Sequence, residues 1–98
     1  MNSQISLIIN QLKKYNPQKI ILFGSYAYGK PNKDSDVDIV LIKETDKSFH
    51  NRQKEARMLL RTTTPVDLFV FTPKEFQQKK KSNPLLKEIA TRGKVIHG

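Results

Sequence analysis

The sequence predicts an α+β fold in which a small mixed β-sheet is flanked by helices. Four short segments have the apolar or alternating pattern of strands. The segments between them have the helical spacing, capping residues and prolines that mark helices. Along the chain the order is helix, strand, strand, helix, strand, helix, helix and a short strand, which fits an α+β or α/β arrangement around a mixed sheet.

The strands are predicted from short runs rich in β-branched residues, at 19–23, 36–42, 66–71 and 94–97. Residues 36–42 alternate, so Asp36 and Asp38 point to the same face and lie at one end of the strand. Residues 66–71 form a strongly apolar run that a single charge, Asp67, interrupts. The last run is long enough only for a terminal edge strand.

The helices are predicted at 3–15, at 49–61, from Pro73 onward and from Pro84 to Arg92. Ser3 is the expected N-cap of the first helix, and Thr72 and Glu75 form a capping box for the third. About one helical turn is expected at 26–29, followed by a loop at 30–35. The second helix is expected to place Phe49, Ala56, Leu59 and Leu60 towards the core and Arg52, Lys54, Glu55 and Arg57 outside.

The composition limits the class of protein. Ninety-eight residues make a single domain, spanning residues 1–98. The chain has no cysteine, which excludes disulfides and thiolate metal sites. Its apolar runs are far shorter than the roughly 20 residues of a membrane span, and the N-terminus lacks the pattern of a signal peptide. We therefore expect a cytoplasmic protein without a membrane segment.

The net charge of +9 predicts attraction to anions such as nucleotides, nucleic acid or an acidic protein. A lysine-rich surface without a dedicated function accounts for the charge equally well. The run Lys79, Lys80 and Lys81 has no interleaved aromatic residue and is favourable near the C-terminal end of a helix. Direct nucleic-acid binding is therefore the weaker interpretation.

Three aspartates on two predicted strands are the candidate metal ligands. An unpaired acid in a buried strand is costly, yet Asp36, Asp38 and Asp67 all lie on apolar backgrounds. If the strands are neighbours, the carboxylates converge and repel each other unless a cation is present. Oxygen ligands favour Mg²⁺ or Mn²⁺, and two such ions form the clamp used in phosphoryl or nucleotidyl transfer. A single Asp could equally be a turn or capping residue, and Asp67 could pair with a buried Arg or Lys.

Gly24 and Ser25 follow the first strand and are the candidate phosphate-binding turn. Glycine lets the backbone approach an anion, and the serine hydroxyl can donate one more hydrogen bond to it. Residues 24–30 also match the first seven positions of a P-loop, but the eighth must be Ser or Thr and is Pro31. The P-loop interpretation is therefore rejected. Tyr26 and Tyr28 could either line the nucleotide pocket or pack against the short helix.

These motifs resemble those of a known family. Gly24-Ser25, ten intervening residues, Asp36-x-Asp38 and a later hydrophobic-Asp67-hydrophobic strand are similar to the nucleotidyltransferase superfamily related to DNA polymerase beta. The small size resembles its minimal nucleotidyltransferase branch, the MntA-type antitoxins. The resemblance covers nearly the whole chain and implies a polymerase-beta-like nucleotidyltransferase fold.

The resemblance also implies roles and partners. Gly24 and Ser25 would bind the triphosphate of ATP, Asp36 and Asp38 would bind two Mg²⁺ ions, and Asp67 would complete the metal site and act as base. Members of this branch transfer AMP to a tyrosine of a partner HEPN-domain toxin. The chain lacks the C-terminal substrate domain of larger relatives, which favours a substrate brought by a partner, in a homo- or hetero-oligomer. The alternative is a non-catalytic antitoxin that neutralises a toxin by forming a complex, with a vestigial site.

Overall fold

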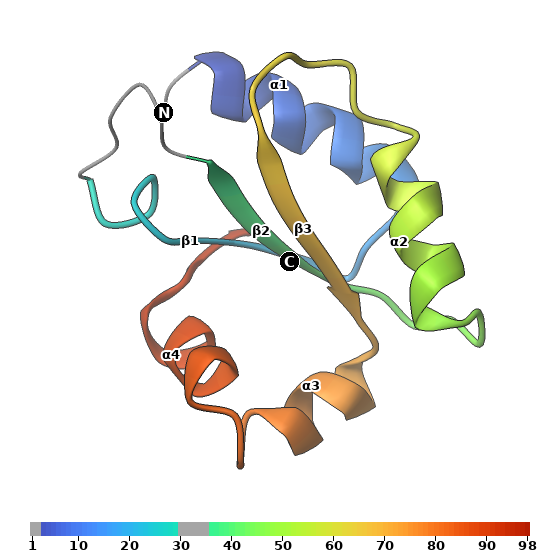
Figure 1. The fold of residues 1–98 in the computed structure, drawn as a ribbon, viewed down its shortest axis with the longest axis vertical. Helices are drawn as coiled ribbons and strands as arrows, with labels where there is room; N and C mark the ends of the chain where they lie inside the picture. Colours follow the sequence, from blue (N-terminus) through green and yellow to red (C-terminus); the bar gives the residue numbers. More distant parts are fainter. Residues whose placement is uncertain (1–2, 30–35) are drawn as a thin grey trace.

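A computed structural model describes residues 3–29 and 36–98. It has a four-stranded mixed sheet in the order β3-β2-β1-β4, covered by helices on both faces (Figure 1). In chain order the elements are α1 (Ser3–Leu12), the 3-10 helix η1 (Lys13–Tyr15), β1 (Lys19–Phe23), β2 (Val37–Ile42), α2 (Phe49–Arg57), β3 (Val66–Phe71), α3 (Pro73–Lys79), α4 (Pro84–Arg92) and β4 (Lys94–His97). The predicted α+β class with a small mixed sheet is confirmed.

The strand pairing brings distant acids to one edge of the sheet. β1 is antiparallel to both β2 and β4, and Phe23 at the end of β1 lies opposite Asp38. β2 and β3 are parallel, in a register that places Asp38 opposite Asp67. Because parallel strands begin at the same edge, the first residues of β2 and β3 meet beside the end of β1.

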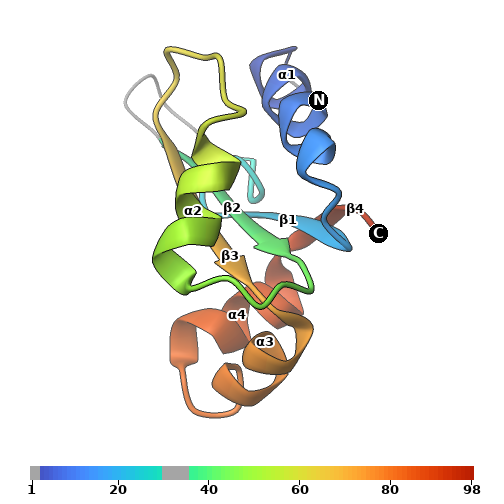
Figure 2. The same cartoon turned by 90° about the vertical axis from the view of Figure 1, so that its right-hand side faces the viewer.

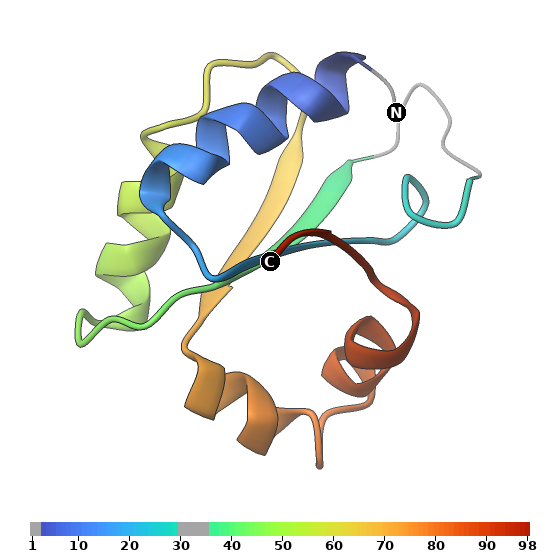
Figure 3. The same ribbon diagram turned by 180° about the vertical axis from the view of Figure 1, so that it is seen from behind.

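Two apolar cores lie on opposite faces of the sheet. α1 and α2 cover one face and α3 and α4 the other, as Figure 2 shows, and the same layers are seen from behind in Figure 3. The α1/α2 core contains Ile8, Leu12, Ile39 and Leu41, all fully buried. The α3/α4 core is smaller, and its buried members are Ile21, Phe23, Val40, Ile42, Phe71, Phe76, Leu86 and Ile89. Asp38 shares a face with Val40 and therefore lies on the α3/α4 side.

The first helix differs in detail from its prediction. Its α-helical part ends at Leu12, and η1 continues to Tyr15, where Asn16 takes a left-handed conformation with φ 57°. Ser3 is the first residue of α1, and residues 1–2 are outside the described part, so its predicted capping role stays a prediction. None of the helices in the described residues has the length and apolar character that a membrane crossing requires.

The second helix corrects three expectations. α2 ends at Arg57, four residues earlier than predicted, and Phe49 is 46% exposed rather than buried. Arg52, expected outside, is only 5% exposed. Its guanidinium donates to the carbonyl oxygens of Lys47 and Val70 and pairs with Glu75 at 2.5 Å, so the buried charge is compensated.

The later helices confirm their predicted starts. The capping box of Thr72 and Glu75 is present, with Pro73 in the first turn of α3, and Asn83 caps α4. Residues 26–29, expected to form about one helical turn, lie in a run of hydrogen-bonded turns at 25–29, in which the N–H groups of Ala27 and Tyr28 both donate to the carbonyl oxygen of Gly24. The loop predicted at 30–35 lies outside the described residues.

Candidate active site

Asp38 and Asp67 form the centre of the candidate site. They occupy partnered positions in the parallel β2–β3 pair, so their side chains extend from the same face of the sheet. Asp38 is half-buried and Asp67 is exposed at the edge strand. The convergence predicted from the sequence is therefore confirmed for this pair of carboxylates.

The pair is electrostatically strained. Burial, a hydrogen bond with Asp67 and the negative charges of Asp67 and Asp36 together raise the pKa of Asp38 to about 6. Burial is the largest of these causes, and all of them disfavour the charged carboxylate. No cationic side chain of the described residues forms an ion pair with either carboxylate. The site thus has negative charge without a cation from the described part of the chain.

Gly24 is packed directly against this carboxylate pair. It has φ +72°, and a Cβ atom placed on it would lie 2.1 Å from Oδ2 of Asp38. Both the backbone conformation and the lack of space disfavour a side chain at this position. The turn after β1 therefore approaches Asp38 as closely as its backbone allows.

The same turn offers unpaired donors. The carbonyl oxygen of Gly24 accepts hydrogen bonds from the N–H groups of Ala27 and Tyr28, at 3.0 and 3.1 Å. Within residues 3–29 and 36–98, the N–H groups of Ser25 and Tyr26 have no acceptor. Successive free N–H groups in a turn form a concave site for an anion. This geometry fits the predicted phosphate-binding role of Gly24 and Ser25.

A cavity of about 370 Å³ opens above these residues, and we call it the acid cavity. It is lined by Phe23, Gly24, Tyr28, Asp38, Asp67, Phe69, Leu85, Glu88 and Ile89. Its volume is within the range of small-molecule sites, roughly 300–1,000 Å³. The strands supply the acids, the turn supplies glycine and tyrosine, and α4 closes one side.

Two residues of α4 at the acid cavity, Glu88 and Arg92, were not assigned a role from the sequence. The guanidinium of Arg92 lies 4.4 Å from the centre of the Tyr28 ring and pairs with Glu88 at 3.1 Å. Arg92 thus holds a positive charge beside the acid cavity, where an anionic ligand would benefit from it. Glu88 and Arg92 are four residues apart on α4, a visible local signal, but their proximity to Tyr28 depends on tertiary packing.

The donor set fits a hard divalent cation. The carboxylates supply only oxygen ligands, and no cationic side chain of the described residues forms an ion pair with them. Among residues 3–29 and 36–98, however, no three His, Cys, Asp or Glu side chains are gathered into a complete ligand set. Asp36 lies directly before β2 and is half-buried. Its negative charge helps to raise the pKa of Asp38, but Asp36 has no paired position on β3. A metal site of all three aspartates stays a prediction.

Comparison with known proteins identifies the family. The profile of the nucleotidyltransferase domain family matches residues 3–97. The chain belongs to this family. The family prediction made from Gly24-Ser25 and the aspartates is confirmed.

A curated relative is a protein of Methanocaldococcus jannaschii that carries the provisional name protein adenylyltransferase MJ0141. The two are 29% identical over 62 residues, which is 63% of this chain and 63% of the relative. The aligned region thus spans less than two thirds of that relative.

Two crystal structures share the fold. One, of a toxin–antitoxin with AMP-PNP, contains a chain that is 29% identical, with a TM-score of 0.61, covering 93% of this chain and 71% of its own. The other, at 1.40 Å resolution, is a Sulfolobus solfataricus protein provisionally named a nucleotidyltransferase. It is 22% identical with a TM-score of 0.51, over 80% of this chain and 81% of its own, and supports the fold alone.

Proposed function

We propose that this chain transfers AMP from ATP to a hydroxyl group of a partner protein. The partner we propose is a HEPN-domain toxin that accepts AMP on a tyrosine, so that the chain acts as its antitoxin. Membership of the nucleotidyltransferase domain family supports the class of reaction. The names of two relatives, a protein adenylyltransferase and a toxin–antitoxin with AMP-PNP, support the acceptor and the nucleotide.

The observation that carries the proposal is the contact between the Gly24 turn and the paired acids. Donors for a phosphate and oxygen ligands for a cation lie side by side, because β1 ends opposite Asp38 and Asp38 lies opposite Asp67. A nucleoside triphosphate bound with a divalent cation needs both kinds of group at this spacing. The acid cavity provides room for part of such a ligand.

The residues have separate tasks in this reaction. Two Mg²⁺ ions bound by Asp36, Asp38 and Asp67 would neutralise the triphosphate and lower the pKa of the attacking hydroxyl. The free N–H groups after Gly24, with the Ser25 hydroxyl, bind the phosphate oxygens. Asp67, at the exposed edge, takes the hydroxyl proton.

The proposed reaction forms one bond and breaks another. The hydroxyl oxygen of the acceptor forms a bond to the α-phosphorus of ATP. The bond from that phosphorus to the oxygen bridging to the β-phosphate breaks, and pyrophosphate leaves. The acceptor arrives from outside the chain, since the carboxylates lie at an open edge of the sheet rather than in an enclosed core.

The test is a mass measurement on the partner. The chain is incubated with Mg-ATP and the protein encoded beside it, and the partner is expected to gain one adenylyl group. Asp38→Asn should reduce the rate by about 10³-fold, in the range of losses for a removed catalytic group. No mass gain, or an equal gain with Asp38→Asn, contradicts the proposal.

A co-expression experiment separates catalysis from simple complex formation. If the chain neutralises the toxin only by binding it, Asp36→Asn/Asp38→Asn protein will still protect cells when it is co-expressed with the toxin. Loss of protection together with loss of the adenylyl group supports the catalytic function.

A further inference from the structure

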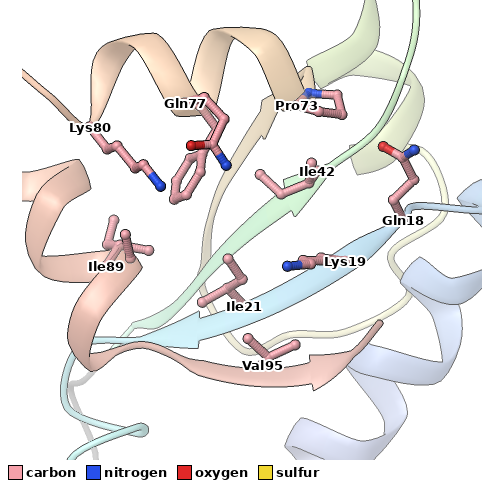
Figure 4. A pocket seen from close by; sticks show the side chains of 11 residues that line it. Gln18, Lys19, Ile21, Ile42, Pro73, Gln77, Lys80, Ile89 and Val95 are labelled. Atoms are coloured by element: carbon pink, nitrogen blue, oxygen red, sulfur yellow. The ribbon is translucent and has the colours of Figure 1, made fainter.

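A second cavity of about 360 Å³ lies on the same face of the sheet, between α3, α4 and β4 (Figure 4). Its apolar surface comes mainly from Ile21, Ile42, Phe76, Ile89 and Val95. Lys19 and Lys80 also line it, and we call it the lysine cavity. Ile89 lines both cavities, so this side chain of α4 separates the lysine cavity from the acid cavity.

The charge of the lysine cavity is not compensated. None of its 11 lining residues, all in the described part of the chain, is acidic. Figure 4 shows Gln77 extending from α3, Lys80 from the end of that helix and Lys19 from β1, around the central isoleucines. Among the described residues, ion pairs with glutamate are formed by Lys47, Arg52 and Arg92. Lys19 and Lys80 have none there.

Two ammonium groups beside an apolar surface favour a ligand that has both an anionic group and an apolar part. Both charges are positive, so each attracts an anion placed between them. The isoleucines and Phe76 offer an apolar surface to the rest of the molecule. The volume accommodates roughly a dozen atoms of the size of water, at about 30 Å³ each.

We propose that the lysine cavity binds a small carboxylic acid with an unbranched apolar chain. The carboxylate lies between Lys19 and Lys80, with the amide of Gln77 available as a further donor, and the chain lies over Ile21 and Ile42. None of the residues named for this binding lines the acid cavity, so the binding does not rest on the nucleotidyltransferase site.

Octanoate is the test ligand, with isotope-labelled full-length chain observed by NMR titration. A Kd on the order of 0.1 mM is expected for a ligand of ten heavy atoms. The shifted signals should include Ile21, Ile42 and Val95. Hexanoate should bind more weakly, by roughly fourfold for each methylene removed, and octan-1-ol should bind at least tenfold more weakly.

Variants distinguish binding in the lysine cavity from attraction of octanoate to the basic surface as a whole. Lys19→Gln/Lys80→Gln should weaken octanoate binding at least tenfold, whereas Lys13→Gln/Lys14→Gln, which removes the same charge from exposed positions on η1, should not. Ala90→Leu, which fills the cavity without changing charge, should also weaken binding. Asp38→Asn should leave it unchanged and thereby excludes the acid cavity as the site.

The proposal is overturned by several results. One is the absence of saturable binding to the wild-type chain at 5 mM octanoate, a limit about 50-fold above the expected Kd. Another is an affinity of Lys19→Gln/Lys80→Gln for octanoate equal to that of the wild-type chain. The third is wild-type binding of octan-1-ol as tight as that of octanoate. Thermal unfolding of each variant confirms that it is folded. None of these measurements requires nucleotide or partner, so failure here leaves the transferase proposal standing, and failure of transfer leaves this one standing.

Discussion

Charged side chains lie at both ends of β3, and only one of the two sites has its charge compensated. Near the end of β3, the guanidinium of Arg52 is surrounded by acceptors: the carbonyl oxygens of Lys47 and Val70, and the carboxylate of Glu75. At the start of the same strand, Asp67 lies beside Asp38, a second negative charge. The charge of Arg52 is compensated within the chain, whereas the acid pair has no counter-charge among residues 3–29 and 36–98.

The difference separates stability from function. A compensated charge such as Arg52 fixes the position of α2 against α3, because its partners lie on both sides of β3. The acid pair stabilises nothing by itself, since its members repel and the pKa of Asp38 is raised. Carboxylates that repel each other and lie beside free backbone N–H groups, as here, are expected at a ligand site rather than in a purely structural role.

The largest expected effect is on catalysis. Asp67→Asn should reduce adenylyl transfer to the partner by about 10³-fold, because the base and a metal ligand are removed together. The free energy of unfolding should stay the same or rise, because a like-charge contact disappears. Mass analysis of the partner and thermal unfolding without metal measure the two effects. A clear fall in the free energy of unfolding would mean that Asp67, like Arg52, stabilises the fold.

The next effect is on stability at the opposite end of β3. Arg52→Met should lower the free energy of unfolding by about 2–4 kcal/mol, because carbonyl acceptors and the Glu75 carboxylate lose their partner. Nucleotide affinity should change less than twofold. Arg92→Met removes a cation from an exposed pair on α4, with side-chain exposures of 61% and 45%, and should change stability by less than about 0.5 kcal/mol. Urea unfolding of the three proteins provides the comparison.

The sequence predicted the acid site better than the Arg52 site. The apolar β-branched runs gave the bounds of β1, β3 and β4 as observed, and alternation placed Asp38 on the face that it occupies. The pairing of Asp38 with Asp67 needed only that β2 and β3 be neighbours. These signals are local and periodic, and therefore visible in one sequence.

Other contacts depend on residues far apart in the chain. Arg52 looked exposed because its helical position is polar, and its partner Glu75 is 23 residues away. Tyr28 meets Arg92 only because α4 packs over the turn after β1. Neither contact leaves a pattern in composition or spacing, so buried ion pairs and cavity walls were the parts that the sequence could not predict.

A third prediction uses the two glycines of the turn. Gly24→Ala and Gly29→Ala both place a side chain at positive φ, +72° and +77°, and each should cost about 1–2 kcal/mol of stability. Only at Gly24 does the new Cβ collide with Asp38; a Cβ placed on Gly29 has no described atom within 4 Å apart from its chain neighbours. Nucleotide affinity, measured with a fluorescent ATP analogue, should therefore fall at least tenfold for Gly24→Ala alone. Equal affinities would show that the close approach to Asp38 is not required.

The smallest expected effect is a pH dependence at the compensated site. Hydrogen bonding to Arg52 lowers the pKa of Glu75 below its ordinary value of 4.5. Because the folded pKa lies below the unfolded one, Glu75 stabilises the fold above about pH 4.5, and this contribution is lost as pH falls through the folded value. Its side chain is 35% exposed, so solvent screening limits the contribution to about 1 kcal/mol.

The measurement is urea unfolding of wild-type and Glu75→Gln protein between pH 7 and pH 3. The wild-type chain should be the more stable at neutral pH, and the difference should shrink as the medium becomes more acidic. In an Arg52→Met background, Glu75→Gln should no longer change the pH dependence, because the cation that lowers the pKa of Glu75 is gone. A difference that persists in that background would mean that the capping hydrogen bond to the N–H group of Thr72, and not Arg52, controls this carboxylate.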